Sequence, residues 1–580
     1  MPIKQSNSIT QVPAMATVEP ARPPLVKSAT VASMALSTTS TVVVPPVPTF
    51  DIEHMPVEND PRTWSSLRKN CILFLIAVAA MVAALAANIQ NPAVEQMEAE
   101  LPATPAQFSL SISMFILVQG LMPVIWSSIS EVKGRKLVYS LSLALFALGS
   151  IVVALSQHIG PVIGFRCLQA AGSSAVMAIG AASLADIFEP EERGRKMGIY
   201  YVAPLLGPAL GPIFGGILTT IWSWRAIFWF LAILCGTCLI AFVLFFHDTF
   251  RPERSLTYQN VLKQRLYAAA ISGDLIKGKP SPMVGKVVQA NKSDINVIDI
   301  EKTTVKTEEN TQDFNELPKI TLTLRDVNPL KPMWLVLRRP NNFLILLTSG
   351  LLYAFGFQLS YATSRRLGDT YGYSPLKIGL VTISYGAGSV MGSLLGGRWS
   401  DRQLRLIREA NGGKAYAEMR LKSTLPGLIM LPCIVLGFGW LCDKIHNVVA
   451  ISFFLFFGGF VYIWIYSSTL AYVVDANVGR SSTAVAANSC FRGIFAFIGT
   501  EVAVPLQSGV GDGLMYTIWT GILLLNSAIV VLVWLKGTKW RENAEAREKR
   551  HAARFDTATF SSTRSSTPPN WYAKLSFPLT

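Results

Sequence analysis

Residues 198–216 of this chain read GIYYVAPLLGPALGPIFGG. The stretch follows the pattern G-x8-G-x3-G-P-x2-G-G, which is formed by Gly198, Gly207, Gly211, Pro212, Gly215 and Gly216. Gly207, Gly211 and Gly215 are four residues apart, so they share one face of a helix, on which a neighbouring backbone can approach closely. Prolines within the segment loosen or kink such a helix. A plain packing face explains the G-x3-G spacing alone, whereas the full pattern is more specific.

The same stretch lies within one of twelve apolar runs. Hydrophobic residues make up 51% of the chain and charged residues 15%, against roughly 25% charged residues in soluble proteins. About 20 apolar residues cross the hydrocarbon core of a bilayer, and in lipid the backbone must satisfy its own hydrogen bonds, so each run is predicted to be a helix. The predicted spans are 70–88, 106–128, 137–156, 161–185, 197–220, 225–247, 342–363, 376–399, 423–442, 448–472, 482–506 and 513–535.

The polar segment 251–340 divides the runs into two groups of six. The predicted fold is therefore an all-α polytopic membrane protein with twelve transmembrane helices in two six-helix halves. The polar segment, the N-terminal residues and residues 556–567 are predicted to be disordered, and the N-terminal residues lack the pattern of a cleaved signal peptide. The predicted divisions are an N-terminal tail (1–64), an N-terminal half (65–250), a linker (251–340), a C-terminal half (341–538) and a C-terminal tail (539–580).

Basic residues concentrate in the connections on one side of the predicted spans, at 131–136, 193–196, 251–340 and 401–422. The connection 89–105, on the other side, contains acidic residues and neither Lys nor Arg. Because positive charge accumulates in cytosolic loops, both termini are predicted to be cytosolic and 89–105 to face outward, in a multi-pass protein of the plasma membrane. Arg365, Arg366 and Lys377 fall on the outward side and are exceptions to this rule.

The net charge of +15 resides mainly in these connections, which does not indicate a nucleic-acid-binding face. The seven cysteines lie inside or at the ends of the apolar runs, so they predict neither a disulfide framework nor a zinc site. The sequence also lacks a P-loop, a nucleophile elbow and a His cluster, which argues against an ATP-driven pump within this chain and against an enzyme. The expected partners are the bilayer and a small-molecule substrate, with no nucleic acid, no metal and no bound cofactor, and the chain is expected to be monomeric.

Three further segments place charged or polar groups in or beside the spans. Residues 127–136, after the second span, read SSISEVKGRK, and residues 397–402, after the eighth, read GRWSDR. Residues 166–172, in the fourth span, read RCLQAAG. Together with 198–216, these segments resemble motifs of the major facilitator superfamily: the signature loop between helices 2 and 3, its degenerate copy after helix 8, the R-x-x-Q-G motif, and the antiporter motif of the proton-coupled drug exporters.

The resemblance runs from about residue 65 to about residue 540 and is strongest to fungal twelve-span drug:proton antiporters, in particular the quinidine-resistance and dityrosine exporters. It implies alternating access by rocking of the two halves around a central site, with the proton as coupling ion and a helix of the opposite half against the glycine face. It also implies a cytosolic charge latch formed by Glu131, Gly134, Arg135, Lys136, Asp401 and Arg402. The sequence departs from the motifs at Ser127 and Ala170, where Gly is usual, and at Glu131, where Asp is usual.

Five polar residues within the spans are candidates for transport and coupling. A charge at membrane depth is costly and usually faces a cavity or a partner, so the motif identifies Arg166, with Gln169, as a proton-linked or substrate-sensing group; snorkelling to the outer interface is the alternative. Glu501 is interpreted as a protonatable coupling group or a counter-charge for a cationic substrate, or else as an interface carboxylate in water. Asn488 and Arg492 are i and i+4 on one helix, and they line a cavity or pack against neighbouring helices.

Five residues of the seventh and tenth spans are candidates for a substrate cavity: Tyr353, Gln358, Tyr361, Tyr462 and Tyr466. Aromatic rings stack on planar or cationic molecules, and interhelical packing is the alternative. The sequence therefore predicts a proton-coupled exporter of small organic molecules or drugs. The alternatives are an uptake symporter or facilitator of a small metabolite, and a non-transporting membrane sensor with the same fold.

Overall fold

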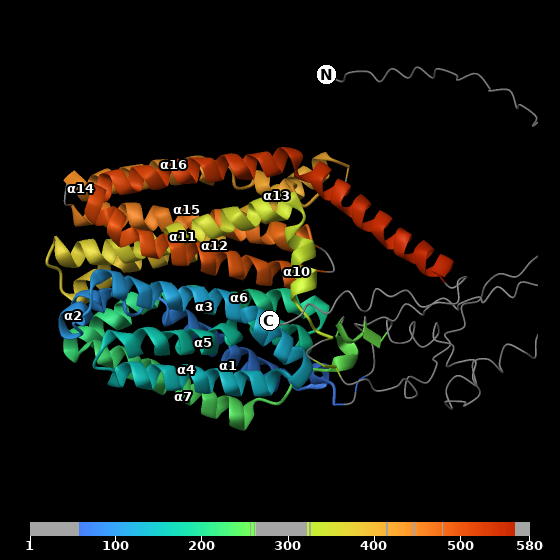
Figure 1. Ribbon diagram of the computed structural model, residues 1–580, viewed down its shortest axis with the longest axis horizontal. Coiled ribbons are helices and arrows are strands. Elements are labelled where there is room, and N and C mark those ends of the chain that lie inside the picture. The colour runs from blue at the N-terminus through green and yellow to red at the C-terminus, as the bar shows by residue number, and fades with distance from the viewer. Residues whose placement is uncertain are drawn as a thin grey trace, which may run out of the picture. The chain divides into compact units, whose positions relative to one another are not determined.

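The computed structural model describes residues 57, 59–255, 257–259, 261–262, 322–323, 326–412, 416–444, 447–477 and 480–562. Throughout these residues the regular structure is helical, and most of the helices run alongside one another (Figure 1). The α-helices are α1 (Ser66–Leu85), α2 (Val94–Glu100), α3 (Pro105–Lys133), α4 (Arg135–Leu155), α5 (Ile159–Ile187), α6 (Pro190–Ile221), α7 (Trp224–Phe245), α10 (Leu330–Leu337), α11 (Pro340–Asp369), α12 (Pro375–Ala410), α13 (Met419–Lys422), α14 (Leu425–Lys444), α15 (Val448–Asp475) and α16 (Ser481–Ser562). Three short 3-10 turns are η1 (Pro61–Thr63), η2 (Asn91–Ala93) and η3 (Pro252–Arg254).

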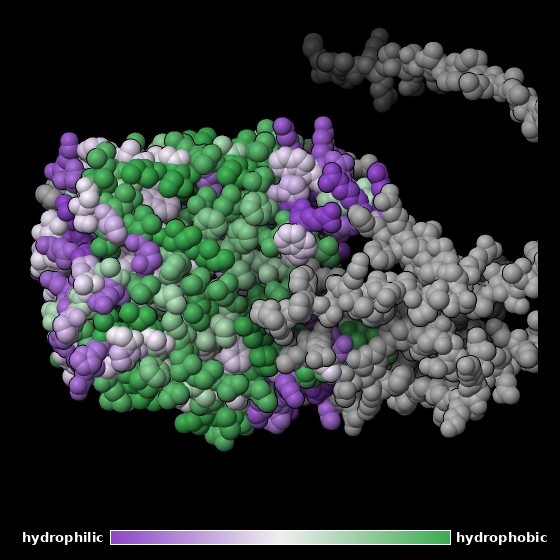
Figure 2. All heavy atoms as spheres, in the orientation of Figure 1, coloured by the Kyte–Doolittle hydropathy of each residue, from purple (hydrophilic) through white to green (hydrophobic). Residues whose placement is uncertain are grey.

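Eleven helices in the described part of the chain are long and apolar enough to cross a membrane. The last of them, α16, changes direction at Gly511, whose φ of 77° and ψ of 171° are not helical. Only glycine adopts a positive φ at little cost, so Gly511 separates a segment 481–510 from a segment 512–562. Each of the twelve predicted spans therefore has a helical counterpart. A hydrophobic band lies between two more polar ends in Figure 2, as lipid contact requires.

Two helical segments lie in the parts of the chain that are predicted to be the linker and the C-terminal tail. The predicted linker contains α10, whose Val336 is 1% exposed and which packs against α16. The predicted C-terminal tail continues α16 to Ser562, into the stretch 556–567 that was predicted to be disordered. Arg541 stabilises this extension through ion pairs with Glu545, one turn ahead (3.6 Å), and with Glu418 (3.0 Å). Most of the predicted N-terminal tail and linker, and residues 563–580 of the C-terminal tail, lie outside the described residues.

Each half has its own hydrophobic core. One cluster of buried side chains is built mainly from α1, α3, α4, α5 and α7, and the other from α11, α14, α15 and α16. In Figure 1 the blue-to-green helices of the first half lie below the yellow-to-red helices of the second. The first cluster also includes Tyr361, Ala496 and Ala503 of the second half. The two halves therefore pack directly against each other through α11 and α16.

The closest contact between the halves runs along α6 and α12. A Cβ added to Gly216 of α6 would lie 2.5 Å from the carbonyl oxygen of Pro375, and one added to Gly386 of α12 would overlap the backbone of Ala209. Gly379 of α12 meets the α6 backbone in the same way. Lipid supplies no hydrophobic force between helices, so close backbone packing of this kind holds them together. We call this contact the first seam.

A second seam joins α3 to α16. A Cβ on Gly120 would lie 2.6 Å from the Cα of Gly493, and a Cβ on Gly493 would lie 2.8 Å from the Cα of Gly120. Real Cβ atoms do not approach other atoms so closely. The two backbones therefore touch at a point where neither helix carries a side chain.

The glycine face of 198–216 packs differently from the expectation of the sequence. Gly207, Gly211 and Gly215 face α1 of the same half, where a Cβ on Gly211 would lie 3.3 Å from the carbonyl oxygen of Leu85 and one on Gly215 would overlap that of Ile89. The helix of the opposite half lies instead against Gly216 and its neighbours. The reason is the helical period, which turns Gly216 about 100° away from Gly215.

We predict that Gly216→Ala shifts the equilibrium between the two access states. Its methyl group would enter the first seam, and overpacking of this kind costs about 1–3 kcal/mol, where about 1.4 kcal/mol is a tenfold change. Gly215→Ala should instead lower thermal stability, because it disturbs packing within one half. The measurement is thiol labelling at the mouths of the two access paths, with thermal unfolding of the purified protein. Gly198→Ala is the control, since nothing lies within 4 Å of the added Cβ. If Gly216→Ala shows the same thiol labelling as the wild type, the first seam does not control the access equilibrium.

Candidate functional site

Arg166 of α5 lies at membrane depth and is completely buried. Its Nη1 donates hydrogen bonds to the carbonyl oxygen of Ala86 (3.2 Å) and to Oε1 of Gln169 (2.7 Å). Gln169 in turn donates through Nε2 to the hydroxyl of Ser150 (2.7 Å). The guanidinium carbon lies 4.0 Å from the ring centroid of Phe115. Arg166 therefore does not snorkel to an interface but links α1, α3, α4 and α5.

The positive charge of Arg166 has no counter-charge among the described residues. Its Nε and Nη2 are buried and have no hydrogen-bond partner there. An unpaired buried cation is costly, and the contact with the Phe115 ring offsets part of that cost. The group therefore supplies a fixed positive potential at membrane depth, which favours a nearby anion and disfavours a nearby cation.

Arg492, in the first segment of α16, is surrounded by tyrosines. Its Nη1 donates to the hydroxyl of Tyr466 of α15 (2.7 Å). The guanidinium carbon lies 3.8 Å from the ring centroid of Tyr353 of α11 and 4.9 Å from that of Tyr466. Tyr462, which is 5% exposed, stacks on Tyr385 with the centroids 6.4 Å apart. The structure thus brings Arg492, Tyr353 and Tyr466 together, and these two rings contact a cation of the chain itself.

Three other predicted site residues are buried. Tyr361 packs into the hydrophobic cluster of the first half. Gln358 and Asn488 are 1% and 2% exposed, and Nε2 of the former and Oδ1 of the latter have no hydrogen-bond partner in the described part of the chain. A buried polar atom left unsatisfied costs about 1–3 kcal/mol. Gln358 and Asn488 therefore stay candidates for contact with a polar substrate.

Glu501 lies at the contact between the halves. Its carboxylate accepts a short hydrogen bond from the hydroxyl of Ser113 in α3. One turn earlier on α3, Ser109 donates to the carbonyl oxygen of Thr500 (3.0 Å). The side chain of Glu501 is half-buried. It is therefore not a freely hydrated interface carboxylate, because it takes part in the contact between the halves.

Two outward arginines that break the positive-inside rule are paired with carboxylates. Arg365 contacts Glu98 of the other half (3.4 Å) and Asp369 (3.2 Å). Arg366 contacts Asp512 (2.8 Å), which is 2% exposed. Each of these charges is thus paired locally, while the excess of Lys and Arg in the other connections still sets the predicted orientation.

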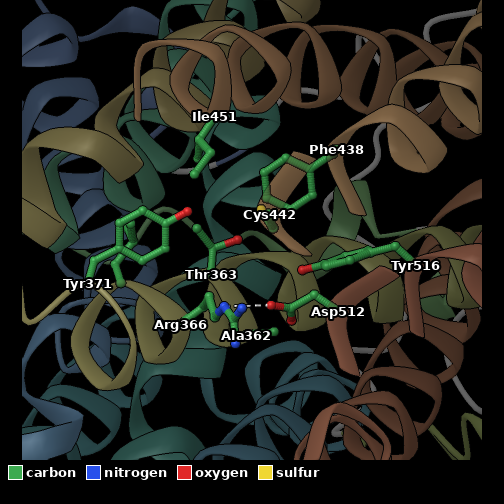
Figure 3. Close-up of a pocket in the computed structure, with 10 residues that line it drawn as sticks. Ala362, Thr363, Arg366, Tyr371, Phe438, Cys442, Ile451, Asp512 and Tyr516 are labelled. Carbon is green, nitrogen blue, oxygen red and sulfur yellow. Dashed lines mark ion pairs between the residues drawn. The ribbon is translucent and has the colours of Figure 1, made fainter. Parts of the chain in front are cut away.

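A small pocket surrounds the second of these pairs. Figure 3 shows Arg366 and Asp512 directed toward each other, with the hydroxyl groups of Thr363 and Tyr516 facing the same space. The cavity has a volume of about 10 Å³, which is enough for about one water molecule. It is therefore too small to bind an organic substrate, and the pair fastens α11 to α16.

The signature loop after α3 forms a compact ionic cluster. Gly134, with a φ of 86°, makes the turn into α4. The carboxylate of Asp248 accepts from the backbone N–H of Arg135 (3.0 Å) and occupies the space that a Cβ on Gly134 would need. The Arg135 side chain donates to Asp186 through Nε (3.3 Å) and to the hydroxyl of Ser130. The cluster ties α3, α4, α5 and the end of α7 together.

The acidic members of this cluster differ from the expectation. The sequence assigned the acidic role to Glu131, but that residue has no ion-pair partner among the described residues. α3 continues to Lys133, so the turn at Gly134 brings Arg135, not Glu131, against Asp186 and Asp248. Lys136 donates to the carbonyl oxygen of Val243 (3.0 Å). All these contacts stay within one half.

The ion pairs of the motif copy in the second half also stay within one half. Asp401 pairs with Arg420 (3.1 Å), which also contacts Asp475. Arg402 is exposed and has no ion-pair partner in the described residues. The functional carboxylates that sequence reasoning missed are thus Asp186, Asp248 and Asp475. For Asp186 a signal was available, because it is the first acidic residue directly after the fourth apolar run.

We expect Asp186→Asn to impair the protein more than Glu131→Gln does. The first change leaves the buried Arg135 guanidinium without its carboxylate partner, which we estimate to cost roughly 1–3 kcal/mol, whereas Glu131 has no partner to lose. Thermal unfolding and substrate flux of both purified variants test this. Equal loss in the two variants would show that Glu131 carries the latch after all.

Comparison with known proteins places this geometry in a family. The sequence profile of the Major Facilitator Superfamily matches residues 76–500, which is well over half of the chain. Two solved structures share the fold at 12% identity. A peptide transporter, POT, in complex with sulfate gives a TM-score of 0.56 over 81% of this chain and 95% of its own. A bacterial homologue of the human lysosomal transporter Spinster gives a TM-score of 0.52 over 83% of this chain and 98% of its own.

Curated relatives of known name cover most of the chain. The MFS antiporter QDR3 of Candida albicans is 28% identical, over 84% of this chain and 81% of its own length. Quinidine resistance protein 3 of Saccharomyces cerevisiae is 26% identical, over 84% of this chain and 85% of its own length. Citrate exporter 1 of Aspergillus niger is 27% identical, over 84% of this chain and 89% of its own length. These matches confirm the resemblance that the motifs indicated: the chain belongs to the major facilitator superfamily and is a multi-pass membrane transporter.

Proposed function

We propose that the protein is a proton-coupled exporter of small organic molecules that works by alternating access in the plasma membrane, with both termini cytosolic. Relatives named as an antiporter, a drug-resistance protein and a citrate exporter support export. The observation that carries the coupling is the hydrogen bond from Ser113 to Glu501, because it joins a protonatable group to the contact between the halves.

The polar contacts between the halves lie near one end of the helices. Four hydrogen bonds or ion pairs join described residues of the two halves toward the end that carries residues 89–105. These pairs are Asn91–Ser360, Glu98–Arg365, Ser109–Thr500 and Ser113–Glu501. The structure is thus closed at the end predicted to face outward.

Closure at this end favours proton uptake. Burying a neutral carboxylic acid costs less than burying a carboxylate, so a proton taken up from outside lowers the cost of closing a contact around a carboxyl group at this end. Glu98 is such a group: burial raises its pKa above the ordinary value, as do Asp369 and Glu95, while Arg365 offsets part of the effect. A carboxyl group whose pKa is higher in the closed state favours that state as the pH falls. A proton taken up outside is therefore carried inward as the outer end closes.

Export uses the reverse step. After the proton leaves toward the cytosol, the charged carboxylate is more stable when the outer end opens and hydrates it. A substrate loaded from the cytosol then leaves outward with that transition. Proton entry and substrate exit are coupled because each uses a different direction of the same rocking movement.

We predict that Glu501→Gln abolishes gradient-driven export but preserves substrate exchange. The amide imitates the protonated acid and cannot release a proton, so the carrier still moves but no longer responds to the gradient. Everted vesicles with an imposed pH gradient measure the first activity, and counterflow without a gradient measures the second. Glu542→Gln, an exposed site further along α16, is the matched control. Normal gradient-driven export in Glu501→Gln would remove this residue from the coupling mechanism.

A further inference from the structure

Arg492 lies at the boundary between the two halves. The next residue, Gly493, touches Gly120 of α3 in the second seam. Tyr353, which covers the Arg492 guanidinium, belongs to α11 but packs against the hydrophobic cluster of the first half. The Arg492 side chain is half-buried, so part of it is open to solvent. A central transport site would lie at this boundary.

The guanidinium of Arg492 is hydrogen-bonded to two tyrosines and keeps one unsatisfied donor. Nη1 donates to the hydroxyl of Tyr466 (2.7 Å), and Tyr353 also makes a side-chain hydrogen bond with the group. Nε is buried and has no hydrogen-bond partner, and no carboxylate pairs with the group, among the residues that the structure describes. The Nε–Nη2 edge carries two parallel N–H donors, which match the two oxygens of a carboxylate. The described residues supply no carboxylate to this edge of Arg492, so a carboxylate of a bound molecule would fit it.

The aromatic rings restrict the charge of a ligand. The sequence suggested that these rings could stack on a cationic substrate. Tyr353 and Tyr466 already contact the cation of Arg492, so they are not free to hold a second one. A second cation beside Arg492 would be repelled at low dielectric. Asn488, one turn earlier on the same face of α16, presents a buried Oδ1 without a partner. That oxygen would accept a hydrogen bond from a hydroxyl group of the ligand.

We propose that Arg492 is the anion-binding group of the transport site and that the exported molecules are small organic acids that bind through a carboxylate. This inference rests on the proposed export function and specifies its substrate class. The carboxylate pairs with the Nε–Nη2 edge, while Tyr466 and Tyr353 hold the guanidinium plane in place. The neutralised pair can then be enclosed as the halves rock, because a paired charge is cheaper to bury than a single one.

The test uses the purified full chain in proteoliposomes under an imposed pH gradient. The probes are radiolabelled citrate and benzoate as carboxylates and tetraphenylphosphonium as a cation. Wild-type protein should transport the carboxylates in preference to the cation. Arg492→Gln should reduce carboxylate flux at least tenfold, and Arg492→Lys should restore part of it, since it keeps the charge but loses the planar fork. Arg547→Gln, an exposed site with the same charge change, should transport like the wild type.

The possible outcomes separate the two proposals. Preference of the wild type for the cation would overturn the anion site and leave the exporter standing. Carboxylate flux that is unchanged in Arg492→Gln would likewise overturn the anion site and leave the exporter standing. Gradient-independent movement of all three probes, or none at all, would overturn both proposals. If Arg492→Gln does not fold, the wild-type preference and the thermal stabilisation of wild-type protein by citrate, but not by tetraphenylphosphonium, decide the matter.

Discussion

Direct backbone contact between the two halves is the constraint on which the rest of this structure depends. At Gly120 and Gly493, and again at Gly216 and Pro375, the helices are so close that no Cβ fits between them. Membrane helices gain no hydrophobic energy from associating in lipid, so such contacts set their geometry. Close-packed interfaces are either made or broken, because interiors do not deform continuously. The polar contacts beyond the seams, from Ser113 to Glu501 and from Arg365 to Glu98, must therefore form and separate together.

The ionic contacts are distributed so that each half moves as a unit. At the end predicted to be cytosolic, Arg135 and Arg420 hold helices of their own half together through Asp186 and Asp401. At the other end, ion pairs and hydrogen bonds cross between the halves. Rigid halves with a breakable contact at one end are what a rocking mechanism requires. Arg166 and Arg492 lie within the spans and have no carboxylate partner among the described residues, so they make the interior favourable for anions.

The fold could be predicted from the sequence, and most of the partnerships in the site could not. Apolar runs of membrane length predict helices because lipid leaves the backbone no other choice. The motif glycines could be recognised, but one residue of rotation separates Gly215, which faces α1, from Gly216, which faces α12. Which of the two meets the other half depends on tertiary packing. Likewise, Asp248 reaches Arg135 from more than a hundred residues away, and nothing local indicates that pairing. The contact of Arg492 with Tyr353 and Tyr466 joins three helices, so its consequence for substrate charge appears only in the fold.

Double electron–electron resonance between spin labels tests the central claim, that protonation closes the outer end while the inner end opens. One labelled pair would join Ala106 to Thr370, which are exposed at the end carrying 89–105, and another would join Lys133 to Glu409 at the opposite end. The exposed Cys71 and Cys433 are first replaced by serine. Lowering the pH should shorten the first distance and lengthen the second, since burial raises the pKa of Glu98 in the closed state. Distances that do not change with pH, or that change in the same direction at both ends, would contradict the account.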